Sequence, residues 1–345
     1  MTEPRYDVIA IGNAIVDVMS PCTEELIDEL DLNKGGMTLV DEDGARRLYE
    51  AMGPAREISG GSAANTLAGM SALGAQCAFV GQVAQDQLGD VFTHDIRAVG
   101  IDFDTPSRAG QPSTARCLIF VTPDGERTMN TFLGASQFLP PAALDDDLIA
   151  SAGILYLEGY LWDPEEPRSA MRRAIEVARK AGRKVAFTAS ESFVIERHGD
   201  DFRALIEEGQ IDILFVNETE LAALTGTSDF EAGLAALEGK VPVLVATRSA
   251  KGAVGIANGH GNLSFHDRVQ LVARLQQARR VHEDDLAVRA RHDPQDAAAG
   301  GLRFGGDDRE ALTHKGVEQG RLAGIGTADD GDVPAPGRRA AARRG

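Results

Sequence analysis

Four short segments of the chain combine glycine, carboxylate and amide groups where a ligand could bind. The first begins with Gly12 and Asn13, directly after the apolar run at residues 8–11, and ends in Asp17. A carboxylate just beyond the first strand of an open α/β sheet lies where such sheets bind ligands, and it could hold two sugar hydroxyls. An aspartate on an edge strand that faces water is the alternative interpretation of Asp17.

The second segment, Gly60-Gly61-Ser62-Ala63-Ala64-Asn65, opens with two glycines ahead of an apolar helical pattern. Glycine lets the backbone approach a ligand closely. The N–H groups of the helix N-terminus that follows would face an anion or a polar group. The alternative is an ordinary helix start in which Ser62 is the cap.

The third and fourth segments each follow an apolar run. In Asn217-Glu218-Thr219-Glu220, the outer two residues lie one helical turn apart, so both would face the same side. They could hold phosphate oxygens and the water shell of Mg²⁺. Asparagine at a cap with glutamate three residues later is also a capping box, and the two interpretations are compatible. The fourth segment, Thr247-Arg248-Ser249-Ala250-Lys251-Gly252, indicates by itself only a loop.

Six short apolar runs must position these segments. They lie at residues 8–11, 78–80, 154–157, 185–187, 213–216 and 243–246. The runs lack polar alternation, which is typical of parallel strands covered on both faces. Helical patterns lie between them, for example at 62–73, closed by Gly74, and at 167–181, closed by Gly182. We therefore predict an α/β fold with a doubly wound, mainly parallel sheet and helices on both faces.

Residues 15–41 and 113–133 depart from this rhythm because they contain alternating apolar and polar residues. The second stretch includes Pro123-Asp124-Gly125, which predicts the turn of a hairpin. A few strands inserted into an α/β core often cover a ligand site. We expect the two stretches to form a small β-strand lid.

Composition excludes several classes of protein. The net charge of −18 disfavours a nucleic-acid partner, although a glycine-rich loop could still bind a small anion. The polar N-terminus and the short apolar run after it fit neither a signal peptide nor a membrane span. Cys22, Cys77 and Cys117 are too far apart for a metal knuckle or a CxxC pair, so we expect reduced, mostly buried thiols in a cytoplasmic protein.

Two nucleotide-binding classes are excluded by their motifs. A P-loop requires GxxxxGK[ST], whereas Gly233 and Gly239-Lys240-Val241 have one residue too many between them and valine at the last position. A Rossmann dinucleotide fold requires GxGxxG after the first strand, and residues 12–14 do not supply it.

Taken in order, the segments resemble the ribokinase (PfkB) family of kinases over residues 6–259. The matching motifs are Gly-Asn-x-x-x-Asp at 12–17, Gly-Gly-Ser-x-x-Asn at 60–65, Gly81 with Asp86 and Gly89, Gly125-Glu126-Arg127 with Gly134-Ala135, Asn-x-x-Glu at 217–220, and Thr-Arg-x-x-x-Gly at 247–252. Gly-Gly-Ser with Asn65 is similar to the adenosine-kinase branch. Ala84 stands where the family usually has glycine.

This resemblance implies a ribokinase-like fold and transfer of a phosphoryl group from ATP, with Mg²⁺, to a hydroxymethyl group of a nucleoside such as adenosine, or of a sugar. Its acceptor residues would be Asn13, Asp17, Gly60, Gly61 and Asn65. Its nucleotide residues would be Asn217, Glu220, Thr247, Ser249 and Gly252, with Glu220 reaching the magnesium through water. The net charge and the polar N-terminus predict no nucleic-acid or membrane partner, and we expect either a monomer or a homodimer through the lid.

The family's Asp-Thr-x-Gly-Ala-Gly-Asp motif has no counterpart in residues 260–345. In the family its glycines form an anion hole and its last aspartate is the general base. The nearest string, residues 324–332, has the wrong order and runs into Pro334 and Pro336, so no catalytic base is assigned to Asp332 or elsewhere. The alternative function is a non-catalytic nucleoside- or sugar-binding protein with a kinase-like fold.

Residues 260–345 also differ in composition from residues 1–259. Residues 261–345 contain 13 arginines but one lysine, and Leu, Ile, Val and Phe make up only 16 of 85 residues. So few large apolar residues are typical of a segment without a packed core. We expect one amphipathic helix at 267–281 in an otherwise disordered or poorly packed tail. The abrupt change at residues 257–262 favours a reading-frame change in GC-rich DNA over an evolved domain.

Overall fold

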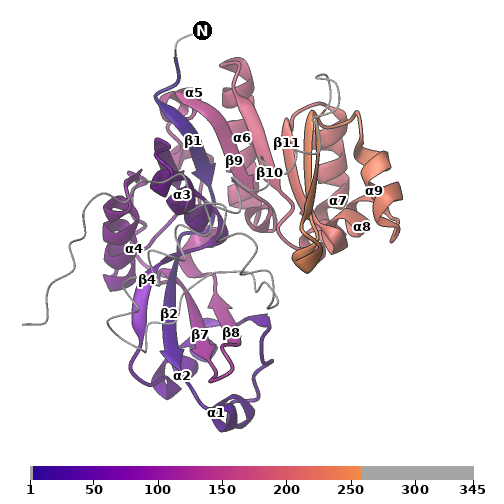
Figure 1. Ribbon diagram of the computed structural model, residues 1–345. Helices are drawn as coiled ribbons and strands as arrows, with labels where there is room; N and C mark the ends of the chain where they lie inside the picture. Colours follow the sequence, from indigo (N-terminus) through magenta and orange to yellow (C-terminus); the bar gives the residue numbers. More distant parts are fainter. Residues whose placement is uncertain (1–2, 258–345) are drawn as a thin grey trace, which may run out of the picture. The chain divides into compact units, whose positions relative to one another are not determined.

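The computed structural model describes residues 3–257, and its largest element is an eight-stranded sheet (Figure 1). The strand order is β13-β12-β11-β10-β9-β1-β5-β6, and within this sheet β13 alone runs antiparallel to its neighbour. The strands are β1 (Tyr6–Ile11), β5 (Cys77–Val80), β6 (Ile101–Asp102), β9 (Ala152–Glu158), β10 (Lys184–Thr188), β11 (Ile213–Asn217), β12 (Val243–Thr247) and β13 (Ala253–Ala257). All six predicted strands are confirmed to within two residues at each end.

Helices cover both faces of this sheet. Because successive side chains of a strand point to opposite faces, β1 divides its residues between two apolar cores: Ile9 and Ile11 pack in one, Val8 and Ala10 in the other. The first core includes α6 and α7, and the second includes α3 and α4. The helices around the large sheet are α3 (Ser62–Ala72), α4 (Gln87–Ala98), α5 (Asp146–Ala150), α6 (Glu165–Lys180), α7 (Ser192–Glu207), α8 (Glu218–Thr225) and α9 (Phe230–Leu237). The predicted fold class is confirmed.

A second sheet of five strands has the order β3-β8-β7-β2-β4. Its strands are β2 (Ile15–Pro21), β3 (Met37–Leu39), β4 (Arg56–Gly60), β7 (Ala115–Val121) and β8 (Arg127–Phe132). Residues 15–41 and 113–133 supply four of them. Strand β4 was not predicted, because it carries one large apolar residue in five. The predicted hairpin turn is confirmed, since β7 and β8 are antiparallel neighbours.

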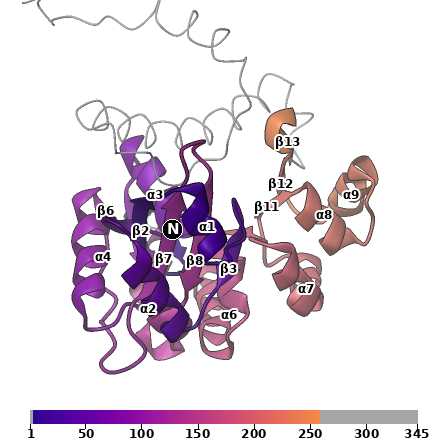
Figure 2. The ribbon, with the colours of Figure 1, turned by 90° about the horizontal axis from the view of Figure 1, so that it is seen from below.

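Two helices, α1 (Glu24–Glu29) and α2 (Glu42–Ala51), lie against one face of this second sheet (Figure 2). Ile27 and Leu48 pack there with Val18, Leu118 and Phe120. Four short 3₁₀ helices complete the described residues: η1 (Gly134–Gln137), η2 (Pro141–Ala143), η3 (Gly159–Trp162) and η4 (Ser249–Lys251).

All three cysteines are free, as predicted, with Cys77 and Cys117 buried and Cys22 half-buried. Within residues 3–257, no helix has the length and apolar character needed to cross a membrane. The predictions for residues 260–345, including a helix at 267–281, concern a part of the chain outside the described residues.

Candidate active site

The loop between β1 and β2 meets the start of α3 at the carboxyl end of the large sheet. Asn13 is buried there, and its Nδ2 donates a hydrogen bond to Oε1 of Glu158, 3.0 Å away. A Cβ on Gly61 would lie 2.4 Å from the carbonyl oxygen of Asn13, and a Cβ on Gly60 would lie 2.4 Å from the carboxyl group of Asp17. Only glycine fits at position 61, where φ is 96° and the close atom belongs to the backbone, whereas a side chain at position 60 would require the Asp17 carboxyl group to move. The fold therefore brings together four of the five predicted acceptor residues.

This loop lies where the strand order of the large sheet reverses. Beyond β1, strands β5 and β6 extend to one side, whereas β9, β10, β11 and β12 extend to the other. Open α/β sheets bind ligands at such a switch point, outside the carboxyl ends of the strands. Asn13 follows β1 and Glu158 ends β9, so their hydrogen bond joins the two strands at the switch point.

The N-terminus of α3 is already occupied by a carboxylate of the chain. Oε2 of Glu158 accepts a hydrogen bond from the N–H of Ala63 at 3.1 Å. Burial raises the pKa of Glu158, although hydrogen bonds from Asn13 and Ala63 act in the opposite direction. First-turn N–H groups attract anions, and Glu158 takes one of these groups, the N–H of Ala63. The interpretation of Ser62 as the cap is wrong, because Gly61, with φ 96°, is the N-cap.

Asn65, the fifth predicted acceptor residue, lies in the first turn of α3. Its backbone N–H donates to the carbonyl oxygen of Gly61 at 2.9 Å, and the residue is half-buried. Asn65 is therefore one helical turn from the glycine pair, on the element that the pair begins.

Asp17 is buried in an interior strand of the five-stranded sheet. Strand β2 lies between β7 and β4, and Asp17 is the register partner of Cys117 and Ile58. Burial raises the pKa of Asp17 to about 7, and the charge of Arg127 offsets only part of this rise. The interpretation of Asp17 as an edge-strand residue facing water is wrong, because only 8% of it is exposed.

Apolar side chains lie beside Asp17 on its face of the five-stranded sheet, together with Thr131, whose Oγ1 donates to Sγ of Cys117 at 3.3 Å, and Arg127, whose charge acts on Asp17. Met19, Cys117 and Ile119 form a buried cluster there, and Ile58 and Met129 are among the half-buried residues that pack on it. Helices α1 and α2 cover the opposite face. A surface of this kind suits a ligand that presents hydroxyl groups to the carboxylate and an apolar ring to the side chains around it.

Strands β11 and β12 end side by side and bring the predicted nucleotide residues together. Asn217 and Thr247 are register partners at the ends of these parallel strands. The side chain of Asn217 accepts a hydrogen bond from the N–H of Glu220 at 2.8 Å, and the Glu220 carboxylate accepts from the backbone N–H and Nδ2 of Asn217 at 3.1 and 2.6 Å. The predicted capping box is confirmed.

Glu220 is a buried carboxylate at this edge. Burial raises its pKa to about 7, the hydrogen bond from the Asn217 backbone lowers it, and the charge of Glu191 raises it further. Within residues 3–257, no group of three or more His, Cys, Asp or Glu residues could hold a metal ion directly. A magnesium ion beside Glu220 would take most of its ligands from water and phosphate, which is how Mg²⁺ usually binds at phosphate sites. The residues present fit an ion held in this way.

Ser249 and Gly252 shape the loop after β12. Both have positive φ, 48° and 83°. The N–H of Gly252 donates to the carbonyl oxygen of Ser249 at 3.1 Å, and the N–H of Arg248 donates to that of Gly252 at 2.7 Å. The chain turns tightly here, directly after the register pair of Asn217 and Thr247. The predicted nucleotide residues therefore form a second cluster.

The two clusters share one edge of one sheet. The first follows β1, the second follows β11 and β12, and strands β9 and β10 lie between them. Since neighbouring strands are about 4.8 Å apart, three such steps separate β1 from β11 by roughly 14 Å. The arrangement can accommodate two ligands side by side along the edge.

A family model for the pfkB family carbohydrate kinases matches residues 50–273. This is more than half of the 345-residue chain. The chain belongs to the PfkB family. The match runs past residue 259, where the sequence analysis placed the end of the resemblance.

Solved structures of two kinases are similar to this chain. A probable sugar kinase from Rhizobium etli is 44% identical, with a TM-score of 0.69, over 74% of this chain and 77% of that one. The adenosine kinase from Sinorhizobium meliloti is 43% identical, with a TM-score of 0.69, over 79% of this chain and 86% of that one. Fructokinase-2 from Solanum lycopersicum is 28% identical over 204 residues, 56% of this chain. The chain spans 61% of the length of that curated relative.

Three residues between the two clusters of this PfkB chain were missed by the sequence analysis. Glu158 ends β9, Tyr160 follows it, and Glu191 caps α7 after β10. Burial is the main cause that raises the pKa of both Tyr160 and Glu220; the charge of Glu191 adds to both shifts, and that of Glu158 adds to the shift of Tyr160. These groups therefore form an acidic row that connects the clusters. The usable signal was the position of each glutamate at or just beyond the carboxyl end of a predicted strand.

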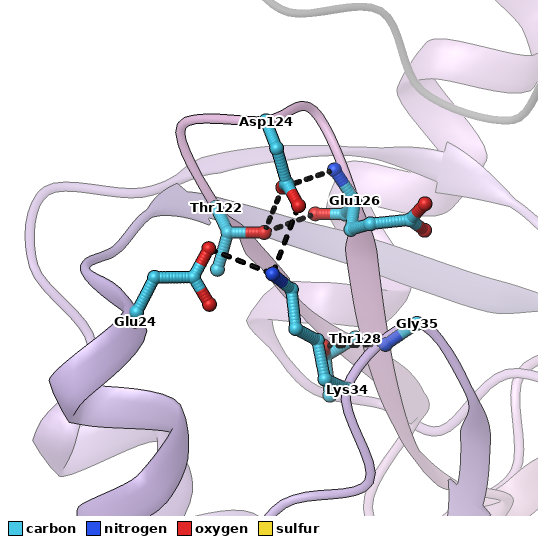
Figure 3. A network of polar contacts seen from close by, with 7 residues as sticks. All are labelled: Glu24, Lys34, Gly35, Thr122, Asp124, Glu126 and Thr128. Carbon is cyan, nitrogen blue, oxygen red and sulfur yellow. Dashed lines mark hydrogen bonds and ion pairs between the residues drawn. The ribbon is translucent and has the colours of Figure 1, made fainter.

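A polar network joins the two stretches predicted to form the lid of this PfkB chain (Figure 3). Nζ of Lys34 lies 2.7 Å from Oε1 of Glu24 and 2.8 Å from Oδ2 of Asp124. Oγ1 of Thr122 donates to Asp124 at 2.6 Å. The two carboxylates raise the pKa of Lys34, and Lys34 in turn lowers the pKa of Asp124. The hairpin is thus tied to the segment before β3, whereas movement of these strands as a lid stays a prediction.

The family motif that carries the general base would follow residue 252 of this PfkB chain. Residues 258–345 lie outside the described residues. The absence of an assignable catalytic base is a sequence-based prediction and stays one.

Proposed function

We propose that this chain binds a nucleoside such as adenosine beside Asp17 and MgATP beside Asn217 and Glu220. It would transfer the γ-phosphoryl group to the hydroxymethyl group of the nucleoside at a much reduced rate. The observation that carries the proposal is the pair of polar clusters at one edge of the sheet, one of them with a buried carboxylate in an apolar surface. A sugar such as ribose or a fructose derivative is the second choice of acceptor.

The apolar surface favours the nucleoside. Similar proteins include both an adenosine kinase and a fructokinase, so family membership alone leaves the acceptor open. A free sugar offers hydroxyl groups on every side, whereas Met19, Ile119 and Met129 offer it no hydrogen bonds. The base of a nucleoside would bury apolar area against these side chains, while the hydroxyls of its ribose donate to Asp17.

Each cluster has a defined task in this mechanism. Asp17 accepts hydrogen bonds from two hydroxyls, which orients the hydroxymethyl group, and such donors favour the ionised carboxylate. Glu158 holds Asn13 and the start of α3 in place. Glu220 would hold the magnesium ion through water, and that ion, when bound, would neutralise charge on the phosphate oxygens.

The reduced rate follows from the missing Asp-Thr-x-Gly-Ala-Gly-Asp motif. A positioned general base typically contributes about 10²–10⁴-fold, and an anion hole about 10²–10³-fold. Turnover should therefore fall far below the roughly 1–100 s⁻¹ of ordinary kinases. The same missing motif favours the second candidate, a nucleoside- or sugar-binding protein without catalysis.

Calorimetry tests the acceptor site. Adenosine, inosine, ribose and fructose are titrated into the full chain, and adenosine should bind more tightly than either sugar. Met129→Ala should weaken adenosine but not ribose, whereas Met70→Ala, which also removes a half-buried methionine, should change neither. If no compound in this panel binds, or if Asp17→Ala changes nothing, the acceptor assignment is wrong.

A turnover assay beside the binding assay separates the two candidate functions. Slow but measurable phosphorylation of adenosine supports the impaired kinase, and tight binding without product over long incubation supports the binding protein. Rates of about 1–100 s⁻¹ would contradict the proposed loss of the catalytic motif.

We also propose that residues 260–345 arise from a reading-frame change near residues 257–262. Arginine replaces lysine almost completely beyond this point and large apolar residues become scarce. Resequencing the gene and translating all frames past codon 259 tests this. A second frame that encodes Asp-Thr-x-Gly-Ala-Gly-Asp within a few tens of codons supports the proposal. If no frame encodes this motif, the tail is native.

A further inference from the structure

The loop after β12 is attached to two helix N-termini by one arginine. Nε of Arg248 donates to Oε1 of Glu218 at 3.0 Å, and its guanidinium carbon lies 3.9 Å from the centroid of the Phe230 ring. Glu218 is the first residue of α8 and Phe230 the first residue of α9. The Arg248 side chain is 26% exposed, so water screens this contact only in part.

The ion pair lies directly beyond the strand ends that carry the nucleotide cluster. Asn217 and Thr247 are register partners at the strand ends, and Glu218 and Arg248 are the residues that follow directly after the two strands. Lys251, with Nζ 3.6 Å from the same Glu218 carboxylate, places a second positive charge beside it. The sheet fixes Thr247 between Asn217 and Ala253, and the Arg248 contacts act on the loop that follows it.

The backbone of this loop requires such support. Ser249 has φ 48°, a conformation that is uncommon for a residue with a side chain. The hydrogen bonds within the loop join Arg248 to Gly252 and to Lys251, and Ser249 to Gly252. They close the turn on itself, while the side chains of Arg248 and Lys251, which both reach Glu218, attach it to the start of α8, and Arg248 alone also contacts Phe230 at the start of α9.

We propose that Arg248 is a positioning residue for the nucleotide site: it holds the loop at residues 247–252 in the conformation that binds the nucleotide. The inference rests on the proposed function. A site that is formed only part of the time has an apparent dissociation constant increased by the inverse of the formed fraction. Loss of Arg248 should therefore weaken nucleotide binding without any loss of a direct contact to the ligand.

Lysine should not replace this arginine fully. A guanidinium is planar, so it can stack on Phe230 while one edge donates to Glu218, whereas an ammonium group provides the charge alone. Arg248→Lys should retain the pairing with Glu218 and lose the stacking, which predicts an intermediate effect.

The experiment measures the affinity of the full chain for a non-hydrolysable ATP analogue in MgCl₂, and for adenosine, by calorimetry. Arg248→Ala should raise the dissociation constant of the nucleotide roughly 5- to 30-fold. Arg172→Ala is the matched control, since Arg172 also combines an ion pair, to Asp201 at 2.9 Å, with a ring contact, to Trp162 at 5.1 Å. The control should leave nucleotide affinity unchanged, and neither variant should change adenosine affinity.

Equal nucleotide affinities in Arg248→Ala and Arg172→Ala would overturn the inference. So would a loss of adenosine affinity in Arg248→Ala as large as its loss of nucleotide affinity. If Arg248→Ala fails to fold, full nucleotide affinity in Arg248→Lys would overturn it. The exchange of Glu218→Arg with Arg248→Glu should recover part of the affinity that Arg248→Glu alone removes, and no recovery also counts against it. A wild-type chain that binds adenosine but no nucleotide overturns the ATP assignment together with this inference, which distinguishes that failure from a failure of Arg248 alone.

Discussion

Replacing Asp17 with asparagine should make the protein more stable at neutral and alkaline pH while it damages the acceptor site. Asp17 is 8% exposed and its pKa is raised to about 7 by burial. A raised folded-state pKa means that the folded chain binds the proton more tightly than the unfolded chain does. The stabilisation that the folded chain gains from protonated Asp17 is therefore fully present below about pH 4 and is lost as the pH rises through about 7.

The size of the effect follows from the pKa change. The shift from 3.8 to about 7 corresponds to roughly 4 kcal/mol at about 1.4 kcal/mol for each pKa unit, as an order of magnitude. Asparagine has nearly the same shape and carries no charge to desolvate. The free energy of unfolding of Asp17→Asn should exceed that of the wild type by about 2–4 kcal/mol at pH 8 and by close to zero near pH 4.

Urea unfolding at intervals between pH 4.5 and 8.5 measures this difference. Other carboxylates titrate in the same range, including Glu220, but they contribute equally to both proteins and cancel in the difference. Asp28→Asn, at an exposed position, is the control and should show no pH-dependent difference. The reasoning is refuted if Asp17→Asn is equally or less stable than the wild type at pH 8. In the same variant, adenosine affinity should fall, because the amide donates where the carboxylate only accepts.

Three further predictions concern other carboxylates and the lid. Glu158→Gln should lower the free energy of unfolding by about 1–3 kcal/mol and weaken adenosine binding. The amide NH₂ of glutamine would face either Nδ2 of Asn13 or the N–H of Ala63, which both donate to Glu158. An unchanged melting temperature and adenosine affinity would contradict this prediction. Glu220→Gln should reduce nucleotide affinity in MgCl₂ but not in EDTA, as measured by calorimetry, and an equal loss in both would exclude the metal role. Lys34→Met should speed amide hydrogen exchange at residues 122–128 and leave the exchange rates in β1 unchanged, because it removes the ion pair to Asp124. Equal exchange rates at residues 122–128 in both proteins would show that this network does not stabilise the hairpin.

The large sheet could be predicted from the sequence because its strands are buried on both faces and therefore read as unbroken apolar runs. Ile9 and Ile11 face one core while Val8 and Ala10 face the other, so β1 contains no polar alternation at its centre. By contrast, β4 was missed because Ile58 is its one large apolar residue, and its place in the sheet comes from pairing with β2. Local pattern does not contain such long-range pairing.

The site was predictable where glycine and amide residues occur at short, regular spacing, as at residues 60–65 and 217–220. It was not predictable where a single residue acts across the fold. Glu158 is separated by 145 positions from Asn13, and Arg248 by 30 from Glu218, yet both pairs form hydrogen bonds. Each of these residues is unremarkable in its own segment. Its role depends on which strands become neighbours, and that is decided by the topology of the sheet.

The burial of Asp17 and Glu220 has a common consequence for the proposed function. Both carboxylates have a pKa near 7 in the absence of ligand, so each carries its charge only part of the time at neutral pH. Hydroxyl donors at Asp17 and a hydrated cation at Glu220 would each favour the ionised form. Ligand binding should then release protons at both sites. Calorimetry at pH 7 in two buffers of different ionisation enthalpy detects this release, and identical heats in the two buffers would show that neither carboxylate titrates on binding.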